Sequence, residues 1–169
     1  MQFERTHNYK TLYLVRHAKS DWENSLLLDI ERPLNNRGYS NANNMSMWFK
    51  SNAYQADCLI SSPAVRAIST ALIFARNLDY NANNIIIKQE LYESSVKDYI
   101  KIIQQVSNDV NSVMLFAHNP TISETANKLC NELPIEMPTS AIVGIRFECD
   151  NWKEIKQGKL FLFEYPKKL

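Results

Sequence analysis

The sequence predicts a three-layer α/β/α domain with a mostly parallel central sheet. Short apolar runs alternate with longer segments of helical periodicity, and 45% of the 169 residues are hydrophobic, enough for a substantial core. Continuous apolar runs are typical of strands buried on both faces, as in parallel sheets covered by helices. Strands that alternate with helices favour parallel pairing through helical crossovers.

Six apolar runs are expected to form the strands of this sheet. They lie at residues 12–15, 58–60, 85–87, 113–117, 141–147 and 159–165. The segment between the last two holds Asp150-Asn151 and Gly158, residue types that favour turns. The last two strands are therefore expected to be antiparallel.

Four segments carry apolar residues at helical spacing. They cover residues 40–51, a stretch from Ser62 to residue 75, residues 96–106, and a stretch that Asn119-Pro120 opens. In the first of them, Met45, Met47 and Trp48 are expected to pack in the core.

The second helix has the clearest start signal. Ser62 followed by Pro63 is typical of an N-cap and a first-turn proline. The apolar face expected for this helix carries Val65, Ile68, Leu72 and Ala75.

Scarce residue types exclude several classes of site. The glycines lie too far apart for a dinucleotide-binding or Walker A loop; they are Gly38, Gly144 and Gly158. The three cysteines contain no C-x-x-C pair, which excludes the common structural zinc sites. Their odd, scattered number suggests free thiols in a reducing compartment.

Charge and hydropathy limit the partners. The net charge of +1 argues against nucleic acid as the main partner. The N-terminal stretch MQFERTH is polar, and no apolar run approaches the roughly 18 residues of a membrane span. We therefore expect one cytoplasmic domain over residues 1–169, with neither a nucleic-acid nor a membrane partner.

Rare basic side chains follow three of the predicted strands. Arg16-His17 ends the first strand, Arg66 lies one helical turn after the second, and His118 ends the fourth. Ligands of open α/β sheets bind beyond the carboxyl ends of the strands, and helix N-termini there favour anions. The pattern predicts a pocket for a phosphoryl group, with no metal or other cofactor, because no metal-ligand spacing is evident.

The segments around these residues resemble the histidine phosphatase (phosphoglycerate mutase-like) superfamily. The similarity is closest to its small SixA-type phosphohistidine phosphatase branch, and it runs from about residue 11 to residue 147. The segments that carry it are Leu14-Val15-Arg16-His17-Ala18-Lys19-Ser20, Arg32-Pro33-Leu34-Asn35 with Arg37-Gly38, Ser61-Ser62-Pro63 with Arg66 and Thr70, Leu91-Tyr92-Glu93, His118-Asn119-Pro120, and Thr139-Ser140-Ala141-Ile142.

The resemblance implies a role for each matching residue. His17 is expected to be the nucleophile and to take the phosphoryl group as a covalent phosphohistidine. Arg16, Arg66 and His118 are expected to bind the phosphoryl oxygens and to neutralise the charge of the transition state. This chemistry needs a neutral His17 and favours a cationic His118, so we expect their pKa values to be pushed apart.

Other positions match the family less closely. Ala18 stands where the widespread motif has Gly, and Glu23 stands where many relatives carry a phosphate-binding Asn after the Trp. Glu93 occupies the position of the general acid in the wider family, and a solvated surface carboxylate is the alternative for it. Weaker candidates for the pocket rim are Ser20, Asn119 and Ser140; Ser20 and Asn119 are counted with the phosphate-binding residues.

These expectations favour a metal-independent phosphatase that works through phosphohistidine, with phosphohistidine in a protein as a possible substrate. One alternative is a phosphatase for a small phosphorylated metabolite. A mutase is less expected, because those relatives are longer and carry extra elements over the site. A non-catalytic phosphate-recognition module is the remaining alternative, although a pure binder has no need of a nucleophilic histidine.

Overall fold

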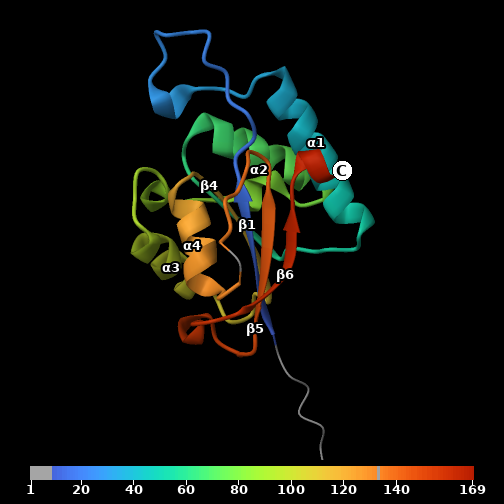
Figure 1. The fold of residues 1–169 in the computed structure, drawn as a ribbon, viewed down its shortest axis with the longest axis vertical. Coiled ribbons are helices and arrows are strands. Elements are labelled where there is room, and N and C mark those ends of the chain that lie inside the picture. The colour runs from blue at the N-terminus through green and yellow to red at the C-terminus, as the bar shows by residue number, and fades with distance from the viewer. Residues whose placement is uncertain (1–8, 133) are drawn as a thin grey trace, which may run out of the picture.

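A six-stranded sheet forms the centre of the molecule, with helices on both faces (Figure 1). The computed structural model describes residues 9–132 and 134–169. The strand order is β3-β2-β4-β1-β5-β6. The strands are β1 (Lys10–Arg16), β2 (Cys58–Ser61), β3 (Ile86–Ile87), β4 (Ser112–Ala117), β5 (Ile142–Phe147) and β6 (Lys159–Glu164).

The sheet is parallel from β3 to β1 and antiparallel at β5. Strand β4 lies between β2 and β1 and is parallel to both, whereas β5 is antiparallel to β1 and to β6. The expected antiparallel final pair is therefore confirmed, and so is the three-layer α/β/α prediction. As a result, the carboxyl ends of β1, β2 and β4 meet at one edge of the sheet.

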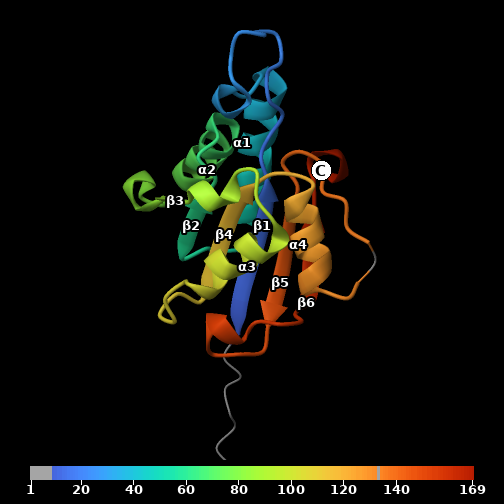
Figure 2. The same cartoon turned by 90° about the vertical axis from the view of Figure 1, so that its left-hand side faces the viewer.

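Each face of the sheet is covered by two helices. The helices are α1 (Asn36–Ser51), α2 (Val65–Asn77), α3 (Val96–Gln104) and α4 (Thr121–Leu129). Helices α1 and α2 lie on one face, and α3 and α4 on the other (Figures 1 and 2). Alternation along β1 serves both layers: Leu12 and Leu14 pack in the core with α3 and α4, and Tyr13 and Val15 pack in the core with α1 and α2.

The predicted start of α2 is wrong. The helix begins at Val65 with Ala64 at the N-cap position, so Ser62 and Pro63 precede it. The amide of Ser62 donates to the carbonyl of Phe116 in β4 at 3.0 Å. Ser62 therefore still belongs to the pairing between β2 and β4, which keeps it out of the helix.

The predicted buried face of α2 is wrong at two of its four positions. Ala75 is buried and Ile68 is partly buried as expected, but Val65 and Leu72 are exposed, at 38% and 44%. The buried face consists of three alanines, Phe74 and two polar residues, Arg66 and Thr70, and the polar residues conceal it from a hydrophobicity pattern.

In α1, Met45 is buried and Trp48 is partly buried as expected, but Met47 is exposed.

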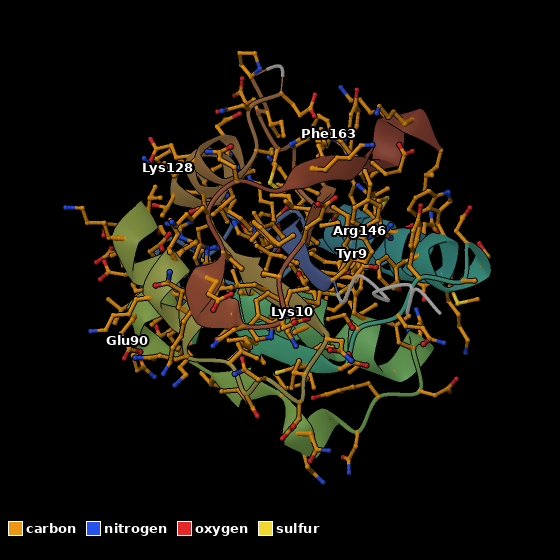
Figure 3. All side chains as sticks on the ribbon, turned by 90° about the horizontal axis from the view of Figure 1, so that it is seen from below. Tyr9, Lys10, Glu90, Lys128, Arg146 and Phe163 are labelled. Atoms are coloured by element: carbon orange, nitrogen blue, oxygen red, sulfur yellow. The ribbon has the colours of Figure 1, made fainter. Side chains whose placement is uncertain are left out.

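Lys10, the first residue of β1, lies at the opposite end of the sheet from the carboxyl ends of β1, β2 and β4 (Figure 3). Its ammonium group is almost fully buried and donates to the carbonyls of Asn108 and Val110 at 2.7 and 3.0 Å. It also lies 5.9 Å from the centre of the Trp152 ring. These contacts satisfy a charge that would otherwise be costly to bury.

None of the helices described in residues 9–132 and 134–169 has the length and apolar character needed to cross a membrane. The cytoplasmic location and the single domain over residues 1–169 stay predictions. The polar N-terminal stretch lies outside the described residues.

Gly38 allows α1 to lie directly against the chain that follows His17. A Cβ atom on Gly38 would lie only 2.1 Å from the carbonyl oxygen of Lys19. The N-cap residue Asn35 holds the same junction, because its amide donates to that carbonyl at 3.0 Å and its side chain accepts from the amide of Gly38 at 2.8 Å. The start of α1 thus buttresses the segment that carries His17.

Gly38→Ala should lower the free energy of unfolding by about 1–3 kcal/mol, because the overlap with Lys19 outweighs the gain of about 1 kcal/mol in helix propensity. Urea unfolding measures the effect. The matched control is Ser40→Ala, at an exposed position of the same helix, which should leave stability nearly unchanged. A Gly38→Ala protein as stable as the parent would contradict this close contact.

Candidate active site

The backbone of His17 is fixed from both sides at the end of β1. Its amide donates to the carbonyl of Ala117 in β4 at 3.1 Å. The amide of Ser140 lies 3.1 and 3.2 Å from the carbonyl oxygens of Arg16 and His17. Ser140 has a φ of 65°, in the left-handed region, which turns the chain into β5 at this point.

The imidazole of His17 is held in one tautomer. Its Nδ1 atom lies 2.7 Å from the carbonyl oxygen of Ala18, an acceptor, so Nδ1 carries the proton and donates. Nε2 therefore keeps its lone pair. Burial lowers the pKa of His17 to about 4, helped by the guanidiniums of Arg66 and Arg16 and opposed by the bond to Ala18.

His118 follows β4 and lies beside His17. Their ring centroids are 5.1 Å apart, and His118 Nε2 lies 2.7 Å from the hydroxyl oxygen of Ser62. Burial, reinforced by His17 and Arg66, lowers the pKa of His118 to about 3. Both pKa values are therefore lowered in the free protein, because both imidazoles are buried beside the same guanidiniums. The expected divergence of the two pKa values is not found, and this environment does not favour a cationic His118 before an anion binds.

Arg66 lies in the first turn of α2 and is bound by a residue that the sequence did not single out. Its Nη1 donates to the main-chain carbonyl of Asp29 at 2.6 Å, and its Nη2 to the carboxylate of Asp29 at 2.9 Å. One turn later, the hydroxyl of Thr70 accepts from the amide of Ala18 at 3.0 Å and donates to the carbonyl of Arg66 at 2.7 Å. Thr70 thus ties the His17 segment to the helix that carries Arg66.

Arg16 and Asn119 share one acceptor. Arg16 Nη1 donates to the carbonyl of Met137 at 2.8 Å, and the side-chain amide of Asn119 donates to the same oxygen at 3.1 Å. The amide oxygen of Asn119 accepts from Ser123 at 2.6 Å. Asn119 therefore holds the same segment as Arg16 and also belongs to the lining of the cavity described next, and its role as a phosphate ligand stays a prediction.

A cavity of about 370 Å³ opens beside these groups. Its lining includes Arg66, His118, Asn119 and Glu93. Glu93 is exposed and has a φ of 51°, in the left-handed region. His17 is outside the lining set, but its ring contacts that of His118, which belongs to it. The structure thus brings the predicted core of the site together and places Glu93 at the wall.

Three other positions singled out in the sequence, Ser20, Ser140 and Glu23, are not among the residues that line this cavity. Ser20 is buried and pairs with Leu34 in an isolated bridge. The hydroxyl of Ser140 is buried and has no hydrogen-bond partner among the described residues. Glu23 is exposed in the loop after β1.

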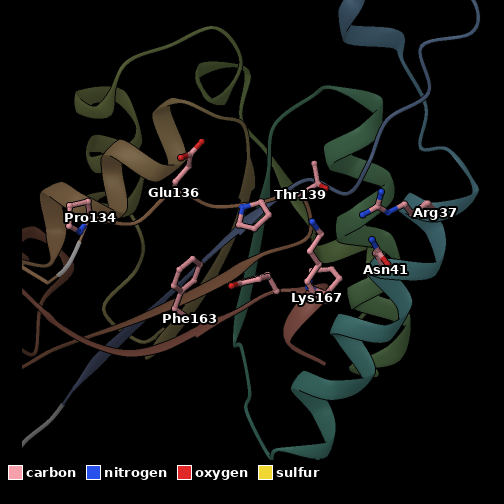
Figure 4. Close-up of a pocket in the computed structure, with 10 residues that line it drawn as sticks. Arg37, Asn41, Pro134, Glu136, Thr139, Phe163 and Lys167 are labelled. Atoms are coloured by element: carbon pink, nitrogen blue, oxygen red, sulfur yellow. The ribbon is translucent and has the colours of Figure 1, made fainter.

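A larger cavity, of about 490 Å³, contains none of the predicted site residues. It is lined by Arg37 and Asn41 of α1, by the loop at residues 134–139 and by the C-terminal segment (Figure 4). Among the described residues, no group of three or more His, Cys, Asp or Glu side chains is placed to hold a metal ion.

Sequence reasoning missed Asp29 and the contact role of Tyr92. The hydroxyl of Tyr92 donates to the Asp29 carboxylate at 2.8 Å, and its ring packs edge-on against His118 with centroids 5.7 Å apart. Tyr92 lies in a segment that carries the family resemblance. Asp29 gives no local signal, because its partners lie far away in the sequence.

A family model named histidine phosphatase superfamily (branch 1) matches residues 12–124. This range contains Arg16, His17, Arg66, Glu93 and His118. This chain belongs to the histidine phosphatase superfamily. As a histidine phosphatase it is a hydrolase of phosphoryl groups, and the matched segment contains every residue that lines the 370 Å³ cavity.

Solved structures agree with this assignment. A protein from Agrobacterium tumefaciens assigned as the phosphohistidine phosphatase SixA is 28% identical, covers 93% of this chain and 98% of its own, and has a TM-score of 0.79. The structure of the protein histidine phosphatase SixA complexed with tungstate is 22% identical, covers 94% of this chain and 98% of its own, and has a TM-score of 0.82. A mycobacterial glucosyl-3-phosphoglycerate phosphatase is 11% identical, covers 94% of this chain and 100% of its own, and has a TM-score of 0.68.

These likenesses confirm the SixA-type, phosphoglycerate mutase-like fold expected from the motifs.

The two imidazoles should titrate far below the ordinary histidine pKa of about 6.5. NMR titration of their ring protons should show both neutral at pH 6, with His17 charging near pH 4 and His118 near pH 3. Because the unfolded chain binds these protons already near pH 6.5, the free energy of unfolding should fall as the pH drops from 6.5 towards 4.

His17→Ala and His118→Ala assign the two signals. Half-protonation of either ring near pH 6.5 in the free protein would contradict the environment described for them.

Proposed function

We propose that this histidine phosphatase transfers a phosphoryl group to Nε2 of His17 and then to water, without a metal, and that its substrate is phosphohistidine in a protein. The observation that carries the proposal is the bond from Nδ1 of His17 to the carbonyl of Ala18. That bond leaves Nε2 unprotonated at neutral pH and aligns the ring, which are the requirements for a histidine nucleophile.

In the first step, the Nε2 lone pair attacks phosphorus, and the bond from phosphorus to the leaving group breaks. The new phosphoimidazole carries a positive charge, which the carbonyl of Ala18 stabilises through Nδ1–H. In the second step, water attacks phosphorus and gives a proton to the carboxylate of Glu93, which lost its own proton to the leaving group in the first step. The P–N bond breaks, and His17 returns to its neutral form as inorganic phosphate leaves.

Arg16, Arg66 and His118 are proposed to bind the phosphoryl oxygens. Two guanidiniums compensate the charge of a phosphoryl dianion, and a neutral His118 donates one N–H. Arrival of the dianion opposes the effect of burial on His118 and favours its protonation. Glu93, at the cavity wall, is the proposed proton donor to the leaving group.

The protein phosphohistidine substrate is supported by the likeness, at 28% identity, to a protein assigned as a phosphohistidine phosphatase. The second candidate is a small phosphorylated metabolite, as suggested by the fold shared with the mycobacterial sugar-phosphate enzyme. A binding module without turnover is disfavoured, since it would not need a histidine held in the nucleophilic tautomer.

His17→Ala should reduce kcat by several orders of magnitude, because it removes the nucleophile, while vanadate still binds through both arginines. Wild-type protein quenched in alkali during a single turnover of ³²P-labelled substrate should carry an alkali-stable, acid-labile label on His17.

The matched control is His7→Ala, the same substitution in the polar N-terminal stretch, and it should retain full turnover. Near-normal turnover by His17→Ala would exclude covalent catalysis by this residue, and so would a failure to trap any labelled histidine.

A substrate panel tests the second part of the proposal. Histidine-phosphorylated carrier proteins should give a higher kcat/KM than phosphoserine proteins, p-nitrophenyl phosphate and sugar phosphates. If a small phosphoester is preferred by orders of magnitude, the protein substrate is wrong, and covalent catalysis by His17 is unaffected.

A further inference from the structure

The guanidinium of Arg66 makes two hydrogen bonds to a single residue, Asp29. Nη1 bonds its main-chain carbonyl and Nη2 bonds its carboxylate, at 2.6 and 2.9 Å. We propose that Asp29 is a positioning residue that fixes the orientation of Arg66 for phosphoryl binding. This inference rests on the proposed function of Arg66 as a phosphoryl ligand.

The bond count leaves Arg66 free to act on an anion. A guanidinium has five N–H donors, and each of the two Nη atoms spends one on Asp29. The N–H of Nε and one N–H of each Nη are left over. Nε and the adjacent Nη form a fork that fits two phosphoryl oxygens, so Asp29 can stay bound to Arg66 while a phosphoryl group binds.

Asp29 can fix Arg66 because its own loop is anchored at the base. The loop covers residues 21–33, and the amide of Asp21 donates to the carbonyl of Pro33 at 2.8 Å. The neighbouring bridge between Ser20 and Leu34 continues this pairing. At the far side of the loop, Asp29 begins a short 3-10 helix, Asp29–Glu31, which presents its carbonyl and carboxylate to Arg66.

Tyr92 holds the carboxylate from the other side. Its hydroxyl donates to the same oxygen that Arg66 Nη2 bonds, at 2.8 Å, and its ring packs against His118. Burial raises the pKa of Asp29, but the bonds from Tyr92 and Arg66 outweigh it and lower that pKa, so the group stays ionised. Asp29 therefore connects three segments that converge on the phosphoryl site.

A carboxylate beside a phosphate-binding arginine has two opposite consequences. If Asp29 competed with phosphate for Arg66, its removal would tighten anion binding. If Asp29 positions Arg66, removal frees the side chain to adopt other rotamers and weakens both anion binding and turnover. The free donors on Arg66 and the second anchor on Tyr92 favour positioning.

Asp29→Ala is expected to lower kcat/KM by about 10-fold and to raise the Kd for vanadate by a similar factor, the size usual for coupled polar neighbours. Asp29→Asn should recover part of the loss, because its amide oxygen can still accept from Nη2 without the charge. The matched control is Ser25→Ala, at an exposed position of the same loop, and this variant should behave as wild type.

A double-mutant cycle with Arg66→Ala separates positioning from general stability. In the Arg66→Ala background, Asp29→Ala should change the vanadate Kd by less than about 2-fold, because its partner is gone. Tighter vanadate binding by Asp29→Ala, an equal loss in Ser25→Ala, or full additivity with Arg66→Ala would each overturn the inference. Unimpaired vanadate binding and turnover by Arg66→Ala alone would instead refute the proposed function of Arg66.

Discussion

The site depends above all on the backbone pairing at the carboxyl end of β1. Strand β1 lies between parallel β4 and antiparallel β5, so the amide of His17 finds a carbonyl on one side and its carbonyl finds the amide of Ser140 on the other. This pairing continues one residue beyond the strand. The backbone of His17 is thereby held on both sides. The hydrogen bond from Nδ1 to the carbonyl of Ala18 then orients the imidazole ring.

Burial then sets the electrostatic character of the site. His17 and Arg66 are each only 8% exposed, so few water molecules compensate the guanidiniums before an anion arrives. Desolvation keeps both imidazoles neutral, and Asp29 supplies the partial compensation that Arg66 requires. An incoming phosphoryl dianion therefore meets a preorganised set of donors. Such donors stabilise the charge of the transition state in phosphoryl transfer.

The sequence predicted what depends on local patterns and strand ends. The positions of Arg16, His17, Arg66 and His118 follow from where apolar strands stop, and their convergence follows from parallel topology. The buried face of α2 was mispredicted because Arg66 and Thr70, which serve the site, occupy positions that a periodicity argument assigns to apolar residues. The neutral His118 and the role of Asp29 could not be predicted, since burial and long-range contact determine both.

Several acceptors in the site are main-chain carbonyls: Ala18 for His17, Met137 for Arg16 and Asn119, and Asp29 for Arg66. A carbonyl survives any substitution that leaves the backbone path unchanged. Substitutions at Ala18, Met137 and Asp29 can therefore leave these main-chain contacts in place. What the contacts require is that the backbone follows the same path.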